Sequence, residues 1–338
     1  MFNTLKNAWR IPDLRKKLLY TLLIIIAFRF GSVVPVPFLN VSALNTLMAS
    51  ANETALGYIN MLTGGAFANA TLFAMGITPY INSSIIIQLL TVAIPALERM
   101  AKEGEEGRKK IAAITRYTTV GLGLIQGTAY YFYLRNNKIT LYNEGFSAVF
   151  TAIIIVLTFT AGTALIMWMG EHITQKGIGN GISIILFAGI VSRGPSLMRT
   201  LANLFQTGTS GIVSGIVMII VGLAIVVFIV YMSNAERRIP VQYAKRVVGR
   251  KMYGGQSTHI PIKVNMSGVM PVIFASALAS IPGTIGGFFP NLYNPDLHPF
   301  AAPFLGMFST NGWVYAAIYL LLIIAFNYFY VAIQYNPV

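Results

Sequence analysis

Residues 61–90 read MLTGGAFANATLFAMGITPYINSSIIIQLL and lie within 44 residues, Thr54 to Leu97, that carry no charged side chain. As a single helix this run would extend about 66 Å, twice the ~30 Å hydrocarbon thickness of a bilayer. The run must therefore fold back or break. Break signals stand at Thr63-Gly64-Gly65 and at Pro79, because glycine favours turns and proline interrupts helices.

Two interpretations of this run remain open from the pattern. Non-helical backbone at membrane depth persists only where protein buries it or where it lines a wet cavity. The first interpretation is a short interrupted helix that enters from the outer side and is followed by a full span. The second is an external loop on the bilayer surface followed by a kinked span, and the pattern alone favours it.

Composition assigns the chain to a class. Hydrophobic residues make up 55% of the 338 and charged residues 10%, whereas soluble domains carry about 25% charge. The apolar runs are continuous, unlike the alternating strands of a membrane β-barrel. These features predict an all-α polytopic membrane protein. The absence of cysteine excludes a disulfide scaffold and a thiolate metal site.

Eight stretches are apolar enough to be spans, at about 20 residues each. The basic and then apolar start lacks a small-residue cleavage site, so we interpret it as a retained span rather than a signal peptide. The fifth stretch is short and contains Arg193. The eight spans are Leu18–Val36, Thr71–Ala96, Ile111–Leu134, Ala148–Gly170, Gly181–Leu197, Ile212–Met232, Met266–Gly286 and Gly312–Gln334.

The basic residues predict the orientation. With eight spans, 19 of the 24 Lys and Arg fall on one side, four on the other, and Arg29 within the first span. Because basic residues accumulate in cytoplasmic loops, we expect a cytoplasmic N-terminus. The bias also supports the fifth span, since without that span the most basic loop would fall on the opposite side of the membrane. The chain ends at AIQYNPV, without a charged flank after the last span, which suggests a truncated or incompletely recorded chain.

Two polar stretches carry little chemical signal. Residues 98–111, ERMAKEGEEGRKKI, have the alternating charges of a solvated loop. Residues 170–183, GEHITQKGIGNGIS, resemble a phosphate-binding loop only superficially, because Gly-Lys-Ser/Thr and a preceding strand are missing. Glu171 and His172 are adjacent, so they cannot chelate one metal ion from one helix face. We expect no enzymatic activity, metal or cofactor.

The segment of residues 234–268 is long and strongly basic, with seven Lys and Arg and two interleaved tyrosines. A topology signal needs only a few charges. The excess predicts docking of a polyanion or acidic partner, for which nucleic-acid phosphate is one candidate and anionic lipid headgroups are the alternative.

The predicted spans contain no Asp, Glu or Lys in their cores. Ion-coupled transporters usually keep such residues at mid-membrane, so a secondary transporter with inverted repeats is the weaker hypothesis. Uncharged polar residues do occur, and they either bond between helices or line a wet path. They are Asn82, Ser83, Ser84, Gln88, Gln126 and Asn265.

Several stretches taken together resemble the SecY family, the protein-conducting channel of the bacterial Sec translocon. They include IPDLRKKLLYTLLIIIAFRFGSVVPVPF, GITPYINSSIIIQLLTVAIPALE, MWMGEHITQKGIGNGISIILFAGIV and GGQSTHIPIKVNMSGVMPVIFAS. The resemblance implies an inverted-repeat bundle of ten spans, of which this chain has eight. Residues 1–200 would form the first half, spans one to five, and residues 201–338 part of the second, spans six to eight, with the basic cytoplasmic loop at 234–265.

The resemblance also implies roles for particular residues. A plug near residues 60–69 would close the channel from outside: Asn60, Met61, Leu62, Thr63, Gly64, Gly65, Ala66 and Phe67. A hydrophobic pore ring would include Ile77, Ile81, Leu186 and Ile273. The lateral gate would include Ser84, Gln88, Gln126, Asn265 and Phe274. Docking of cytoplasmic partners would fall to Lys245, Arg246, Arg250 and Lys251.

By this resemblance the chain is expected to pass unfolded secretory polypeptides across the bacterial plasma (inner) membrane and to release signal or membrane segments sideways. The implied partners are the SecE and SecG subunits, the SecA motor, the ribosome through contacts to rRNA, signal sequences, unfolded preproteins and membrane lipids. The pore would be passive, because the sequence has no nucleotide-binding Gly-Lys-Ser/Thr motif. A non-conducting scaffold is a third hypothesis.

Overall fold

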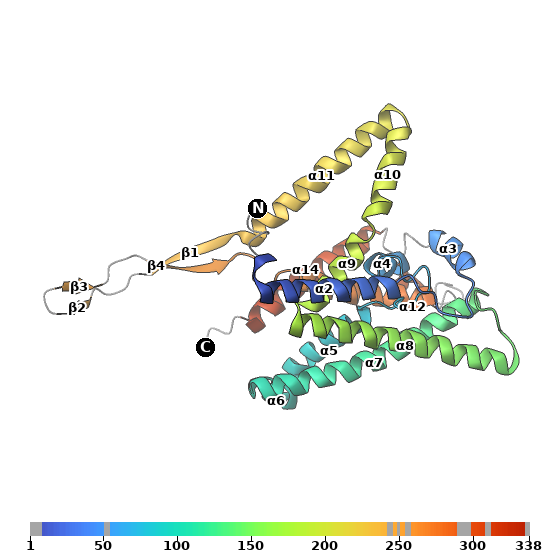
Figure 1. Cartoon of the computed structure of the whole chain (residues 1–338), viewed down its shortest axis with the longest axis horizontal. Coiled ribbons are helices and arrows are strands. Elements are labelled where there is room, and N and C mark those ends of the chain that lie inside the picture. The colour runs from blue at the N-terminus through green and yellow to red at the C-terminus, as the bar shows by residue number, and fades with distance from the viewer. Residues whose placement is uncertain are drawn as a thin grey trace. The chain divides into compact units, whose positions relative to one another are not determined.

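The computed structural model describes residues 9–50, 55–241, 246–248, 251–253, 258–288, 299–307 and 312–334, and most of them are helical (Figure 1). The predicted helical class is confirmed. The chain divides into two compact units. Unit 1 contains Met1–Pro195 and Ser276–Tyr319, and unit 2 contains Ser196–Ala275 and Leu320–Val338.

Unit 1 holds most of the predicted first half. Its two longest helices, α7 and α8, have 32 residues each and pack along one another (Figure 1). Gly123 and Gly127 of α7 face α8, which allows the close helix approach typical of membrane proteins. The helices that lie wholly within unit 1 are α2 Pro12–Gly31, α3 Val41–Ser50, α4 Ala55–Leu62, α5 Thr78–Ala93, α6 Pro95–Lys102, α7 Glu105–Asn136, α8 Gly145–Lys176, α9 Gly181–Val191 and α13 Ala301–Met307.

The structure moves the start of the second predicted span. That span was expected from Thr71, but residues 72–77 form turns and α5 begins at Thr78. Pro79 therefore lies in the first turn of α5, where its missing N–H removes no helical hydrogen bond. Protein buries this part of the chain, because Phe67, Thr71 and Ala74 are each at most 1% exposed. Its placement relative to the membrane stays a prediction.

The described part of the chain has four helices that are long and apolar enough to cross a membrane, namely α8, residues 181–206, α11 and α14. A fifth appears if α5 and α6, bent by 100°, count as one span. The predicted count of eight is not confirmed by this measure. Three further predicted spans coincide with α2, α7 and α12, but the described residues of these helices do not reach the length, hydropathy and charge limits of this measure.

Within the described residues, the strands all lie in unit 2. The predicted basic loop forms two antiparallel strand pairs, β1 with β4 and β2 with β3. Apolar residues alternate with polar or proline residues at Ile239 and Val241 of β1 and at Ile260 and Ile262 of β4, which is a strand period. Ile239 pairs with Ile260. The elements are α11 Thr209–Asn234, β1 Glu236–Val241, β2 Arg246–Val248, β3 Lys251–Tyr253 and β4 Thr258–Lys263.

Three helices cross the division between the units. They are α10 Gly194–Gln206, α12 Met270–Phe288 and α14 Trp313–Gln334. The predicted fifth span is thus α9 and the start of α10, separated at Ser192 and Arg193. In α11 nearly every large apolar side chain is exposed, which is the expected surface of a helix that faces lipid.

Candidate functional site

The predicted plug, residues 60–67, is a compact turn at the end of α4. Gly64 and Gly65 have positive φ angles of 65° and 92°, which glycine adopts without steric cost. Asn60 closes the turn twice: its carbonyl accepts a hydrogen bond from Gly65 N at 2.9 Å, and its Oδ1 accepts one from Ala68 N at 3.0 Å. Phe67 N donates to Thr63 Oγ1 at 3.2 Å. The segment therefore has a defined shape of its own.

Tyr130 of α7 anchors this turn, and an aromatic run is the only sequence signal at this position. Its Oη donates to the Phe67 carbonyl at 2.7 Å, and the two rings stack with centroids 4.4 Å apart. The Tyr130 side chain is fully buried in an apolar cluster that also contains Phe159 of α8. The end of the predicted plug is thereby tied to the long helices.

We expect Tyr130→Phe to lower the stability of unit 1 and to loosen residues 60–67. The change leaves the buried Phe67 carbonyl without its partner, which costs about 1–3 kcal/mol. Thermal unfolding in detergent measures the loss. Tyr117→Phe is the matched control, because Tyr117 lies on the same helix and is 80% exposed. Equal melting temperatures for the two variants would contradict the anchor.

Three of the four predicted ring residues lie around one apolar cluster of unit 1. Ile77 is buried within it beside Ile185, and Ile81 and Leu186 are partly buried against it. Ile77 directly precedes α5, and Ile81 N donates to the Ile77 carbonyl at 3.1 Å, so the two side chains share one helix face. Ile273 lies on α12 in unit 2.

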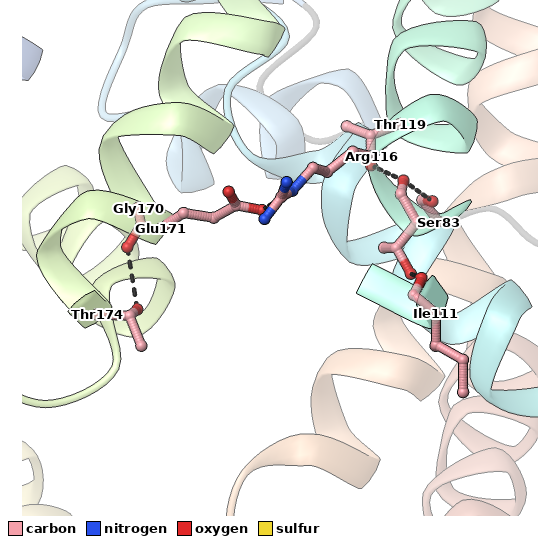
Figure 2. A network of polar contacts seen from close by, with 8 residues as sticks. Ser83, Ile111, Arg116, Thr119, Gly170, Glu171 and Thr174 are labelled. Atoms are coloured by element: carbon pink, nitrogen blue, oxygen red, sulfur yellow. Dashed lines mark hydrogen bonds and ion pairs between the residues drawn. The ribbon is translucent and has the colours of Figure 1, made fainter. Parts of the chain in front are cut away.

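The predicted gate residues are divided between the units. In unit 1, Ser84 and Gln88 of α5 and Gln126 of α7 are partly buried. The hydrogen bond that joins these helices comes from their neighbour Ser83, which is fully buried and donates to the Thr115 carbonyl at 2.8 Å (Figure 2). This bond fixes α5 against α7.

In unit 2, the predicted gate residues lie at the start of α12. Asn265 Oδ1 accepts a hydrogen bond from Gly268 N at 3.0 Å and shapes the turn that leads into the helix. Phe274 is 4% exposed and meets Phe326 and Tyr330 of α14 edge-on, at 5.9 and 6.3 Å between ring centroids. Phe274 is therefore a packed residue in this structure.

The predicted docking residues are only partly described. Lys245 and Arg250 lie outside the described residues. Arg246 and Lys251 begin β2 and β3, the two short strands that pair with each other. The strands place these backbone positions in a hairpin rather than in the irregular loop that was expected.

Among the described residues, the ion pairs at the ends of the unit 1 helices are mostly exposed. Lys102 donates to Glu98 at 2.7 Å, and this hydrogen bond, with the charge of Lys102, lowers the pKa of Glu98. Exposed pairs of this kind add little stability. The pair between Arg116 Nε and Glu171 Oε1, at 2.6 Å, is less exposed and links α7 to α8 (Figure 2).

The glycine-rich stretch that follows Glu171 is a helix connector. Asn180 Oδ1 accepts hydrogen bonds from the N–H groups of Ile182 and Ser183 and caps α9. A Cβ on Gly181 would overlap the carbonyl oxygen of Gly170, so α8 and α9 meet backbone to backbone. This contact sets the position of α9, which carries Leu186.

Comparison with known proteins gives one family. The SecY family model matches residues 71–338. Similar sequences include the protein translocase subunit SecY of Halalkalibacterium halodurans, 45% identical, and that of Bacillus subtilis, 42% identical; each alignment covers 100% of this chain and 77% of the relative. The Thermotoga maritima subunit is 41% identical over 100% of this chain and 76% of its own.

Solved structures share the fold. "The structure of a protein conducting channel" superposes with a TM-score of 0.60 at 18% identity, over 94% of this chain and 71% of that one. A Sec61 chain from the canine ribosome–channel complex gives 0.52 at 16% identity, over 91% and 72%.

Proposed function

This chain belongs to the SecY family of protein translocase subunits, and we propose that its unit 1 carries the residues that close a protein-conducting channel. It is a multi-pass membrane protein. The observation that carries the proposal is the meeting of Ile77, Ile81 and Leu186 at one apolar cluster. An aliphatic constriction has no group that grips a passing chain, and it excludes ions by dewetting.

Residues 60–67 act as the plug in this proposal. They carry no charge and fold into a self-bonded turn held by Tyr130. A segment of this kind closes an opening without binding what passes through it. The uncharged turn would block the channel at one end of the constriction, and the aliphatic ring would form the constriction itself.

The lateral gate opens, in this proposal, between α5 and α12. Ser84, Gln88 and Gln126 supply polar contacts on one wall, and Asn265 and Phe274 lie on the other. Polar contacts between membrane helices are worth about 1 kcal/mol each, so an apolar signal helix displaces them readily. Residues 1–200 and 201–338 would be the two halves that part.

Single cysteines at Ser84 and Phe274 should crosslink to the signal sequence of a stalled preprotein. The chain has no cysteine of its own, so each variant reports one position. Ile220→Cys is the control, because Ile220 lies on α11 and is 60% exposed, which places it toward lipid. Adducts at position 220 alone, or at no position, would sink the gate proposal.

Partners and orientation complete the proposal. The chain assembles with the SecE and SecG subunits in the bacterial plasma membrane, with its N-terminus in the cytoplasm. SecA or the ribosome supplies the driving force, and the basic segment of β2 and β3 meets one of them. The support for this docking role is the density of positive charge at residues 234–268 and the salt-dependent attraction of such segments for polyanions.

A further inference from the structure

The turn of the plug rests on the backbone of α9 at two glycines. A Cβ on Gly189 would lie 2.9 Å from the carbonyl oxygen of Leu62, and a Cβ on Gly64 would lie 2.7 Å from the Gly189 carbonyl oxygen. Backbone atoms cannot move aside as a flexible side chain can, so any larger residue at either position must separate the two segments. Gly64 and Gly189 thus form a close backbone contact.

The same helix carries a residue of the proposed ring. Leu186 and Gly189 are three positions apart on α9 and therefore lie on one face. Ser192, three positions further, donates from its Oγ to the Gly189 carbonyl at 2.5 Å, and this bond fixes the last turn of α9 at the contact. A movement of α9 that widens the ring also withdraws the surface on which the plug rests.

We propose that the contact between Gly64 and Gly189 is a latch that couples release of the plug to movement of α9. This inference rests on the proposed function, since it assumes that residues 60–67 are the plug. Gly189 is a positioning residue: it touches the plug, and it acts on the pore through α9.

Arg29 of α2 also lies beside the contact between Gly64 and Gly189, and it weakens that contact. A Cβ on Gly64 would lie 3.3 Å from Arg29 Nη1, and this nitrogen is buried without a hydrogen-bond partner in the structure. A buried donor that lacks a partner raises the free energy of the state that buries it. Departure of the plug would admit water to Arg29 Nη1, so the closed latch is held only weakly.

Thiol labelling of the plug tests the latch in the full channel complex, reconstituted in vesicles. Ala66 is 1% exposed, so Ala66→Cys should react slowly with a membrane-impermeant maleimide added from the outer side. Adding Gly189→Ala should speed labelling about tenfold, since overpacking at the contact shifts the plug toward its released position. Gly121→Ala, on α7 with nothing within 4 Å of its Cβ position, should leave the rate unchanged.

A second pair of variants separates the latch from backbone strain. Gly64 and Gly65 both have positive φ, but a Cβ on Gly65 meets nothing within 4 Å. Gly64→Ala should therefore label faster than Gly65→Ala. Equal rates in this pair, or equal rates for Gly189→Ala and Gly121→Ala, would overturn the latch. Because ring conductance is a separate measurement, a failed latch leaves the proposed channel function intact.

Arg29→Met tests the role of Arg29, and it should change the labelling rate in the direction opposite to Gly189→Ala. Methionine keeps an apolar stem of similar length without the unpartnered donor, so labelling of Ala66→Cys should slow about threefold or more. Faster labelling would show that the guanidinium holds the plug in place and would overturn the assignment of Arg29 as the loosening group.

Discussion

Glycine at positions 77 and 81 should raise the ion conductance of the closed channel in planar bilayers about tenfold or more. The two isoleucines share one helix face, and Ile77 is buried in the cluster against which Ile81 and Leu186 also pack. Removing both side chains widens the aliphatic constriction and lets water enter, and a wetted constriction no longer excludes ions.

The control for this variant is a second isoleucine pair. Ile216 and Ile220 are four residues apart on α11 and are 48% and 60% exposed, so Ile216→Gly with Ile220→Gly removes the same two side chains at an exposed helix face and should add no leak. The conservative pair Ile77→Val with Ile81→Val should keep the seal. Unchanged conductance after the glycine pair at 77 and 81, with the protein still folded, would count against the ring.

Reversing Arg250 and Lys251 to glutamate should weaken binding to the ribosome or to SecA by about tenfold to a hundredfold at moderate salt. Each lost contact between a basic side chain and a phosphate also lowers the slope of log K against log salt by about one. The measurement is the binding constant across a salt series.

The matched control for the charge reversal lies on the predicted opposite side of the membrane. Arg135 and Lys138 are exposed at the end of α7 and in the turn beyond it, so their reversal to glutamate changes the net charge equally. Binding should be unaffected by that pair. If reversal at 250 and 251 left binding unaltered as well, the basic segment would be a topology signal and no more.

The sequence predicted local structure best at residue types that have one dominant backbone preference. Gly64 and Gly65 predicted the break that ends α4, because both occupy left-handed backbone. Pro79 also predicted a break, but its position was misjudged: proline is favoured in a first helical turn, and the helix begins there instead of bending there. Continuous apolar runs located α8 and α11 closely.

Contacts between distant segments could not be predicted from the pattern. Tyr130 reaches Phe67 across 63 residues, and an aromatic run within a span gives no sign of which ring will bond to a distant turn. The strands β1 and β4 were missed because each has only two alternating aliphatic residues, Ile239 and Val241 in one and Ile260 and Ile262 in the other. The contact of Gly64 with Gly189 depends on how α9 is placed, which Gly170 and Gly181 determine through tertiary packing.

Photocrosslinking from the ring residues to an arrested preprotein tests the channel most directly. A photoreactive amino acid at Ile81 or Leu186 should form adducts with a polypeptide stalled in mid-translocation, whereas the same probe at Val227, 67% exposed on α11, should form none. Adducts at positions 81 and 186 are the predicted result. Adducts at position 227 without any at 81 or 186 would contradict the claim that translocating chains pass through this ring.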